Sequence, residues 1–108
     1  MDLVTEKQVD QALHFLAESD AEVANARVMV MRSEYMADVA EALAYKIGSG
    51  SVRDREMAAK VSPEVRKAME AVFEATEAYE MVKARRKRAE LTIEVWRSWN
   101  ASKRVGNV

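Results

Sequence analysis

The residues best suited to chemistry form a basic segment near the end of the chain. Five of the six residues in Lys83-Ala84-Arg85-Arg86-Lys87-Arg88 are basic, and Trp96, Trp99 and further bases follow on the same stretch. Guanidinium and ammonium groups neutralise phosphates, while indole rings stack on bases. The segment therefore predicts single-stranded nucleic-acid binding. The candidate residues are Lys83, Arg85, Lys87, Arg88, Arg97, Trp99, Lys103 and Arg104.

A second interpretation of these residues is purely structural. The bases would keep a long helix soluble and complement the negative end of its dipole, and Trp96 would be a core residue. Arg86 falls on the apolar seam of the helix described below. It either pairs with a carboxylate from the first helix, Asp20, Glu22 or Glu18, or marks a point where the seam opens.

The charge is distributed unevenly although the net charge is only −1. From Lys83 onward there are eight basic and two acidic residues, a net +6, against nine basic and sixteen acidic residues before it, a net −7. Such a split indicates either a polyanion site at one end or pairing between oppositely charged ends of different copies.

Two rows of carboxylates suggest a metal site, but more weakly than the basic segment suggests nucleic-acid binding. Glu70, Glu74, Glu77 and Glu80 share a helix face, as do Glu34, Asp38 and Glu41. Similar acidic rows bind Mg²⁺ or Mn²⁺ in the all-helical nucleotide pyrophosphohydrolases. Here they alternate with alanine as on any solvated face, and no glycine-rich phosphate loop accompanies them. A metal-dependent hydrolase using Glu70, Glu74 and Glu77 is therefore the weakest alternative, and we expect no enzyme, cofactor or metal.

The single histidine has no evident catalytic partner. His14 stands beside Leu13, Phe15 and Leu16, and the chain offers no nucleophile for it to activate. We expect a histidine on a helix face with a local hydrogen bond.

The basic segment belongs to a long helix predicted over 63–104. Ser62-Pro63-Glu64 is a helix start: serine accepts from first-turn N–H groups, proline lacks an N–H that would go unpaired, and glutamate meets the positive dipole end. A heptad seam follows, in which alanines allow a partner helix to approach closely. Its members are Val65, Ala68, Val72, Ala75, Tyr79, Val82, Arg86, Ala89, Ile93, Trp96 and Asn100.

A first long helix is predicted over 5–46. Thr5 and Gln8 have the spacing of a capping box. The helix would bury two apolar faces, the first Val9, Ala12, Leu13 and Leu16, the second Ala24, Val28, Met31, Tyr35, Val39 and Ala42.

The remaining segments connect and end these helices. A loop at 47–51 places Gly48 for a left-handed helix cap and Ser51 to begin a short helix over 52–61. The tail 105–108 is expected to fray.

These elements predict an all-α fold, a single helical domain over 1–108. The two long helices would form an antiparallel, coiled-coil-like hairpin with the short helix at its bend. Apolar residues also lie partly off the seam, which favours self-association into an oligomeric bundle or ring. They are Phe15, Met29, Val30, Met36, Met81, Leu91 and Trp99.

Composition favours a cytoplasmic protein without a membrane segment. There is no cysteine, which fits a reducing compartment. The N-terminus lacks the basic and apolar regions of a signal peptide, and no run of 18 apolar residues occurs.

The chain resembles small phage-encoded helical proteins and, more distantly, the UvsY-type family of phage recombination mediators. The residues that carry the resemblance are Tyr45-Lys46-Ile47-Gly48, the basic run from Lys83 to Arg88, and Ile93-Glu94-Val95-Trp96-Arg97-Ser98-Trp99. It implies an oligomeric, non-enzymatic protein of the host cytoplasm that binds single-stranded DNA. Its implied partners are a recombinase and a single-strand binding protein. It also implies that Lys46 and Arg53 contact DNA beside the basic C-terminal run.

The leading hypothesis is thus an oligomeric single-stranded nucleic-acid-binding accessory protein. The alternative from another class is a structural or adaptor hairpin whose charges serve protein–protein pairing.

Overall fold

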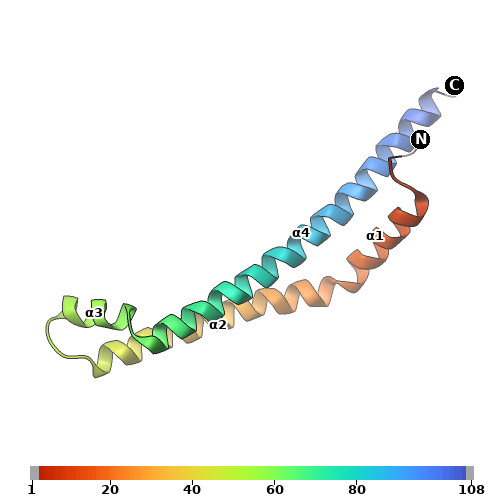
Figure 1. Ribbon diagram of the computed structural model, residues 1–108. Coiled ribbons are helices and arrows are strands. Elements are labelled where there is room, and N and C mark those ends of the chain that lie inside the picture. Colours follow the sequence, from red (N-terminus) through yellow and green to blue (C-terminus); the bar gives the residue numbers. More distant parts are fainter. Residues whose placement is uncertain (1–2, 107–108) are drawn as a thin grey trace. The chain divides into compact units, whose positions relative to one another are not determined.

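The computed structural model describes residues 3–106, which form four helices and no strand (Figure 1). The helices are α1 (Glu6–Glu18), α2 (Asp20–Ile47), α3 (Val52–Lys60) and α4 (Pro63–Gly106). The predicted all-α fold is therefore confirmed.

The chain, predicted as one domain, divides into two compact units. The first, here called the terminal unit, combines the described residues of Met1–Ala24 and Glu80–Val108, so that α1 lies with the later part of α4. The second, the middle unit, is Asn25–Tyr79 and contains most of α2, all of α3 and the first part of α4. Within the middle unit α2 and α4 run antiparallel and α3 lies between them in sequence, as predicted for a helical hairpin (Figure 1).

The predicted helix starts are present as hydrogen-bonded caps. The Gln8 backbone N–H donates to Thr5 Oγ1 at 3.2 Å, and the Thr5 N–H donates to Gln8 Oε1 at 2.8 Å, which closes a capping box. Ser51 begins α3 in the same way with Asp54. The Val65 N–H donates to Ser62 Oγ at 3.3 Å. Each cap satisfies first-turn donors that have no partner inside the helix.

The boundaries differ from the sequence prediction at three points. The single helix predicted over 5–46 is interrupted at Ser19, which separates α1 from α2. In the loop after α2, the left-handed backbone conformation expected at Gly48 occurs at Gly50, which has a φ of 100°. Val105 and Gly106, expected to fray, continue α4, while residues 107 and 108 lie outside the described range.

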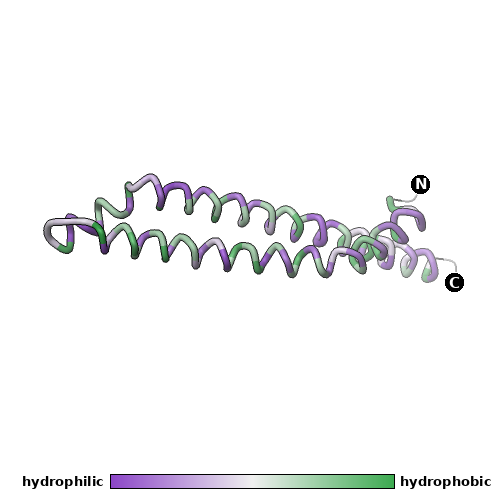
Figure 2. Tube along the Cα trace, turned by 90° about the horizontal axis from the view of Figure 1, so that it is seen from below, coloured by the Kyte–Doolittle hydropathy of each residue, from purple (hydrophilic) through white to green (hydrophobic). Residues whose placement is uncertain are grey.

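The predicted seam of α4 is confirmed at every position. All eleven seam residues are buried or half-buried, whereas almost all the other residues of α4 are exposed. Hydrophobic and hydrophilic residues recur together along α4 (Figure 2), as a one-sided apolar seam requires.

The second apolar face predicted for the first helix is wrong. Its large members Val28, Met31 and Tyr35 are 43%, 59% and 68% exposed, and only Val39 is half-buried. The face that packs in the middle unit lies on the opposite side of α2 and is made of small residues. Its buried and half-buried members are Ala26, Val30, Ser33, Ala37, Ala40 and Ala44. Small side chains let the α2 and α4 backbones approach closely, which the alanines of the α4 seam also require.

The terminal unit has its own small core. Val9 and Ala12 of α1 pack with Ala89 and Ile93 of α4, and partly buried residues surround them. These surrounding residues are Val4, Phe15, Leu16 and Trp96. The core fixes which side of α4 faces α1, and so determines where the basic side chains are presented.

Candidate nucleic-acid interface

The predicted basic segment lies in the terminal unit, on the part of α4 that packs beside α1. Arg86 is on the seam and is only 21% exposed in its side chain, whereas Lys83, Arg85, Lys87 and Arg88 are exposed residues. The heptad therefore divides the run into one inward-facing arginine and four outward-facing bases.

Arg86 connects α4 to the junction of α1 and α2. Its Nη1 donates to the Leu16 carbonyl at 2.9 Å and to Ser19 Oγ at 2.6 Å, and its Nη2 lies 2.9 Å from Asp20 Oδ1. Of the alternatives that the sequence left open for Arg86, the structure shows the ion pair with Asp20. Ser19 lies between α1 and α2 and is only 2% exposed. Its hydroxyl accepts the hydrogen bond from the Arg86 guanidinium. Arg86 is a structural residue of the terminal unit.

Arg85 and Lys83 also have partners within the chain. The Arg85 guanidinium carbon lies 4.7 Å from the centre of the Phe15 ring, and its Nη1 is 3.8 Å from Glu22 Oε1. Lys83 pairs with Glu80 at 3.4 Å, one turn back on α4. Some of the acidic residues from the first part of the chain therefore form ion pairs with the basic segment inside the terminal unit.

A groove between α1 and α4 brings the basic segment together with an aromatic ring. Phe15, Arg85 and Arg88 line it, together with polar and apolar neighbours. These neighbours are Leu3, Val4, Gln8, Gln11, Ala12, Ala89 and Thr92. Two guanidiniums beside a phenyl ring and two amides form a surface that can contact both a phosphate and a base edge.

Four bases of the segment carry no ion pair within residues 3–106. They are Lys87, Arg88, Arg97 and Arg104, and all four are exposed. An exposed base without a carboxylate neighbour gives up no existing interaction when it binds a phosphate. These four are the strongest candidates for phosphate contact.

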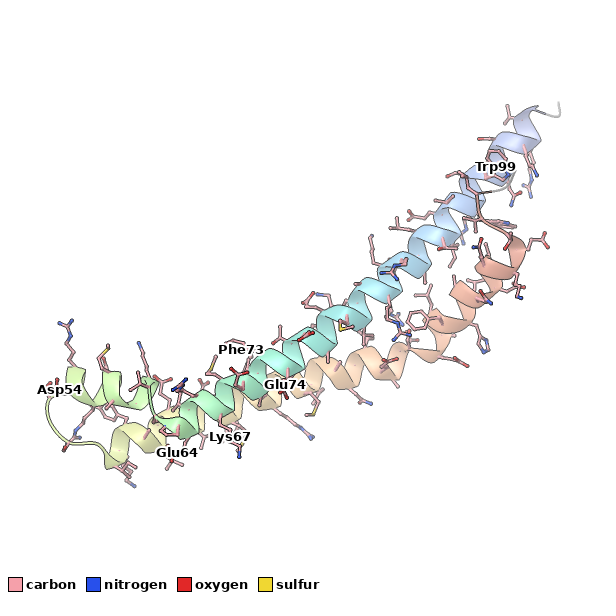
Figure 3. The ribbon with its side chains drawn as sticks, viewed as in Figure 1. Asp54, Glu64, Lys67, Phe73, Glu74 and Trp99 are labelled. Atoms are coloured by element: carbon pink, nitrogen blue, oxygen red, sulfur yellow. The ribbon has the colours of Figure 1, made fainter. Side chains whose placement is uncertain are left out.

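The two tryptophans have different surroundings. Trp96 packs against the core of the terminal unit, as predicted. Trp99 is half-buried near the C-terminal end of α4, where Figure 3 labels it, and Lys103 Nζ lies 5.9 Å from the centre of its ring. The Trp99–Lys103 pair is a cation–π contact that combines a stacking surface with a positive charge.

The other two predicted contacts lie in the middle unit. Lys46 is in the last turn of α2 and Arg53 is in the first turn of α3, and both are exposed. Their role in DNA contact stays a prediction.

His14 and the acidic rows have simple surroundings. His14 Nε2 and Glu18 Oε1 are 2.8 Å apart on exposed side chains, so His14 has a local polar partner one turn along α1. Glu74 is an exposed residue in the first part of α4 (Figure 3). In the part of the chain that the structure describes, no three histidine, cysteine or acidic residues are grouped so that they could hold a metal ion.

No helix within residues 3–106 has the length and apolar character needed to cross a membrane.

Sequence reasoning missed Ser19, Phe15 and the glutamines of the groove. Arg86 on the seam was a signal for a polar partner, but carboxylates were the obvious candidates and a buried serine was not. Phe15 was recognised only as an apolar residue off the seam, so its contact with Arg85 was not foreseen.

The structure is thus an all-α chain in which an exposed basic stretch of α4 lies next to α1 in the terminal unit. Comparisons with models of known protein families, with curated proteins and with solved structures find no match to this chain.

Proposed function

We propose that this protein binds single-stranded nucleic acid through the basic segment of α4 in the terminal unit. The observation that carries the proposal is that Lys87 and Arg88 are exposed, adjacent and without an ion pair within residues 3–106, while Arg86 between α4 and α1 holds the helix in place. The segment is thus positioned by one arginine and has its neighbouring charges available for phosphates.

The groove supports single strands over duplexes. Arg88 lines it with the Phe15 ring, and the Trp99 ring lies further along α4. Unpaired bases can stack on such rings, at about 1–3 kcal/mol per base, whereas bases inside a duplex are not accessible to them. We therefore expect a preference for single strands, with little dependence on sequence.

The resemblance to recombination mediators extends this proposal to a cellular role. On this view the protein would bind DNA that is coated with single-strand binding protein and assist a recombinase to load. A recombinase filament assay with and without this protein, on strands pre-coated with single-strand binding protein, tests that role separately from binding.

The test of the binding site is a pair of matched double variants. Lys87→Ala/Arg88→Ala removes the two unpaired bases, and Arg66→Ala/Lys67→Ala removes an exposed adjacent pair from α4 in the middle unit. Both variants change the net charge equally. Binding is measured by fluorescence anisotropy of a labelled single strand over a series of salt concentrations, with helix content checked by circular dichroism.

The expected result is specific to the first variant. Each phosphate contact contributes about 0.7 to the slope of log K against log salt, so losing two lowers the slope by about 1.4 and the affinity at about 50 mM salt by about 60-fold. The control should keep the slope of the parent. Equal behaviour of the two variants would show that the assigned site is wrong and would favour the adaptor hypothesis.

A further inference from the structure

In the middle unit, α2 carries a second apolar stripe on the side opposite its packed face. Val28, Met31, Tyr35 and Val39 recur at three-four spacing, and the first three are 43–68% exposed. Val28, Met31 and Tyr35 line one groove together with Arg32 and Met36. A helix with apolar residues on two opposite sides is typical of one that packs against two partners.

The stripe has the same order of side-chain sizes in both directions. From Val28 through Met31 and Tyr35 to Val39 it reads medium, large, large, medium. If a second α2 is laid antiparallel on this face with a two-fold axis between Met31 and Tyr35, Val28 meets Val39 of the partner. Met31 then meets Tyr35 of the partner, and both ends of the contact are equivalent. A two-fold interface requires this kind of self-complementary pattern.

The charges beside the stripe reverse about the same point. Arg27 lies on its N-terminal side and Asp38 on its C-terminal side. Both lie on the same flank of the stripe, and an antiparallel two-fold pair brings like flanks together, so Arg27 comes beside Asp38 of the partner. Neither residue forms an ion pair within residues 3–106 of its own chain. Charge complementarity of this kind sets the direction in which helices pair.

We propose that a second copy of this chain binds the Val28–Val39 face of α2 antiparallel, forming a two-fold homodimer. The proposal concerns the middle unit and does not depend on nucleic-acid binding. It also accounts for the exposure of Val28, Met31 and Tyr35, which the packing of the middle unit leaves uncovered.

The first test compares two lysine substitutions at equal exposure. Met31 on the stripe and Met81 on α4 in the terminal unit are each 59% exposed. Sedimentation velocity over a concentration series should give the parent and Met81→Lys twice the 12.2 kDa chain mass, and Met31→Lys the mass of one chain. Helix content from circular dichroism should stay at the parent level in both variants.

The second test exchanges charges across the proposed axis. Arg27→Glu places acidic residues opposite one another at both ends of the pair, and Asp38→Arg places basic residues there. Each variant alone should dissociate about tenfold more readily than the parent. In an equimolar mixture, the Arg27→Glu chain meets the Asp38→Arg chain with both contacts attractive, so the mixture should regain the affinity of the parent.

Three results would overturn the proposal. One is a parent that sediments at 12.2 kDa at every concentration. Another is a Met31→Lys variant that associates as strongly as the parent. The third is a mixture of the two charge variants that dissociates as readily as each does alone.

Discussion

Replacing Arg86 with methionine should destabilise the terminal unit strongly although only one residue changes. Methionine keeps an unbranched apolar stem on the seam but removes the hydrogen bonds to the Leu16 carbonyl and Ser19 Oγ, 2.9 and 2.6 Å long. A hydrogen bond from a charged donor contributes about 1.5–3 kcal/mol. The two bonds would then sum to about 3–6 kcal/mol if they were fully shielded from water.

Contact with solvent makes the free energy lost in this variant smaller than that sum. The Arg86 side chain is 21% exposed, and Asp20, its ion-pair partner, is 73% exposed. The Asp20 pair should therefore contribute no more than about 1 kcal/mol, and water can reach part of the guanidinium. We expect Arg86→Met to lower the free energy of unfolding by about 2–4 kcal/mol, and Asp20→Ala by less than about 1 kcal/mol.

A change at Ser19 distinguishes the hydrogen bond from general packing. In the parent, Ser19→Ala removes an accepting hydroxyl from Arg86 and should destabilise by about 1 kcal/mol. In the Arg86→Met background the Ser19 hydroxyl, 2% exposed as a residue, has lost its donor. The same Ser19→Ala change should then be neutral or stabilising, because it removes a buried polar group that lacks its partner.

The assay is urea unfolding followed by circular dichroism, at one fixed protein concentration, together with amide hydrogen exchange. Exchange should accelerate in Arg86→Met at the amides that bridge the helix junction, Ser19 to Phe15 and Val23 to Ser19. The reasoning is refuted if Arg86→Met costs less than about 0.5 kcal/mol, or if Ser19→Ala costs the same in both backgrounds.

Two further predictions concern the middle unit. Ala37→Leu should cost about 1–3 kcal/mol in urea unfolding, because Ala37 is 6% exposed in the packed face of α2, whereas Ala78→Leu on the exposed side of α4 should be close to neutral; equal costs would contradict the assignment of the packed face. Gly50→Ala should lower the free energy of unfolding, measured in the same urea experiment, by about 1–2 kcal/mol. Gly50 has a φ of 100°, and a Cβ there would lie 3.1 Å from Asp54 Oδ2. Gly48→Ala, which meets only ordinary contacts, is the control, and a Gly48 effect as large as that of Gly50 would contradict the argument.

The fold was predictable from the sequence where a helix start or a heptad pattern is set by residues close to one another in the chain. Ser62-Pro63-Glu64 and the heptad seam determine α4, and each seam residue is buried or half-buried as expected. Thr5 with Gln8 likewise predicted the start of α1. These signals act within a few residues of one another, so they need no knowledge of the rest of the chain.

The packed face of α2 could not be found by ranking hydrophobicity. Val28, Met31 and Tyr35 are the more apolar choice, yet the face that packs contains Ala37 and Ser33. Its selection depends on the distance between helix backbones, which is a property of the pair and not of one helix. The serine is tolerated there because its hydroxyl donates to the Val30 carbonyl at 2.9 Å.

The sequence located the basic segment but not the surroundings of its members. It gave Arg86 three possible carboxylate partners or an opening of the seam, and the structure shows the pair with Asp20. It could not separate Arg85, which lies over the Phe15 ring, from Lys87 and Arg88, which have no ion pair within the described residues. That separation depends on how α1 lies beside α4 in three dimensions, so a periodic pattern does not contain it.

The most direct measurement of the central claim is the salt dependence of single-strand binding by the parent protein. Lys87, Arg88, Arg97 and Arg104 offer four phosphate contacts, which predict a slope of about −2.8 and a loss of affinity of about 50-fold between about 50 and 200 mM salt. A labelled strand of about 30 nucleotides, titrated at several salt concentrations, gives this slope directly. Binding that does not change with salt, or no binding at the lowest salt, would contradict the account.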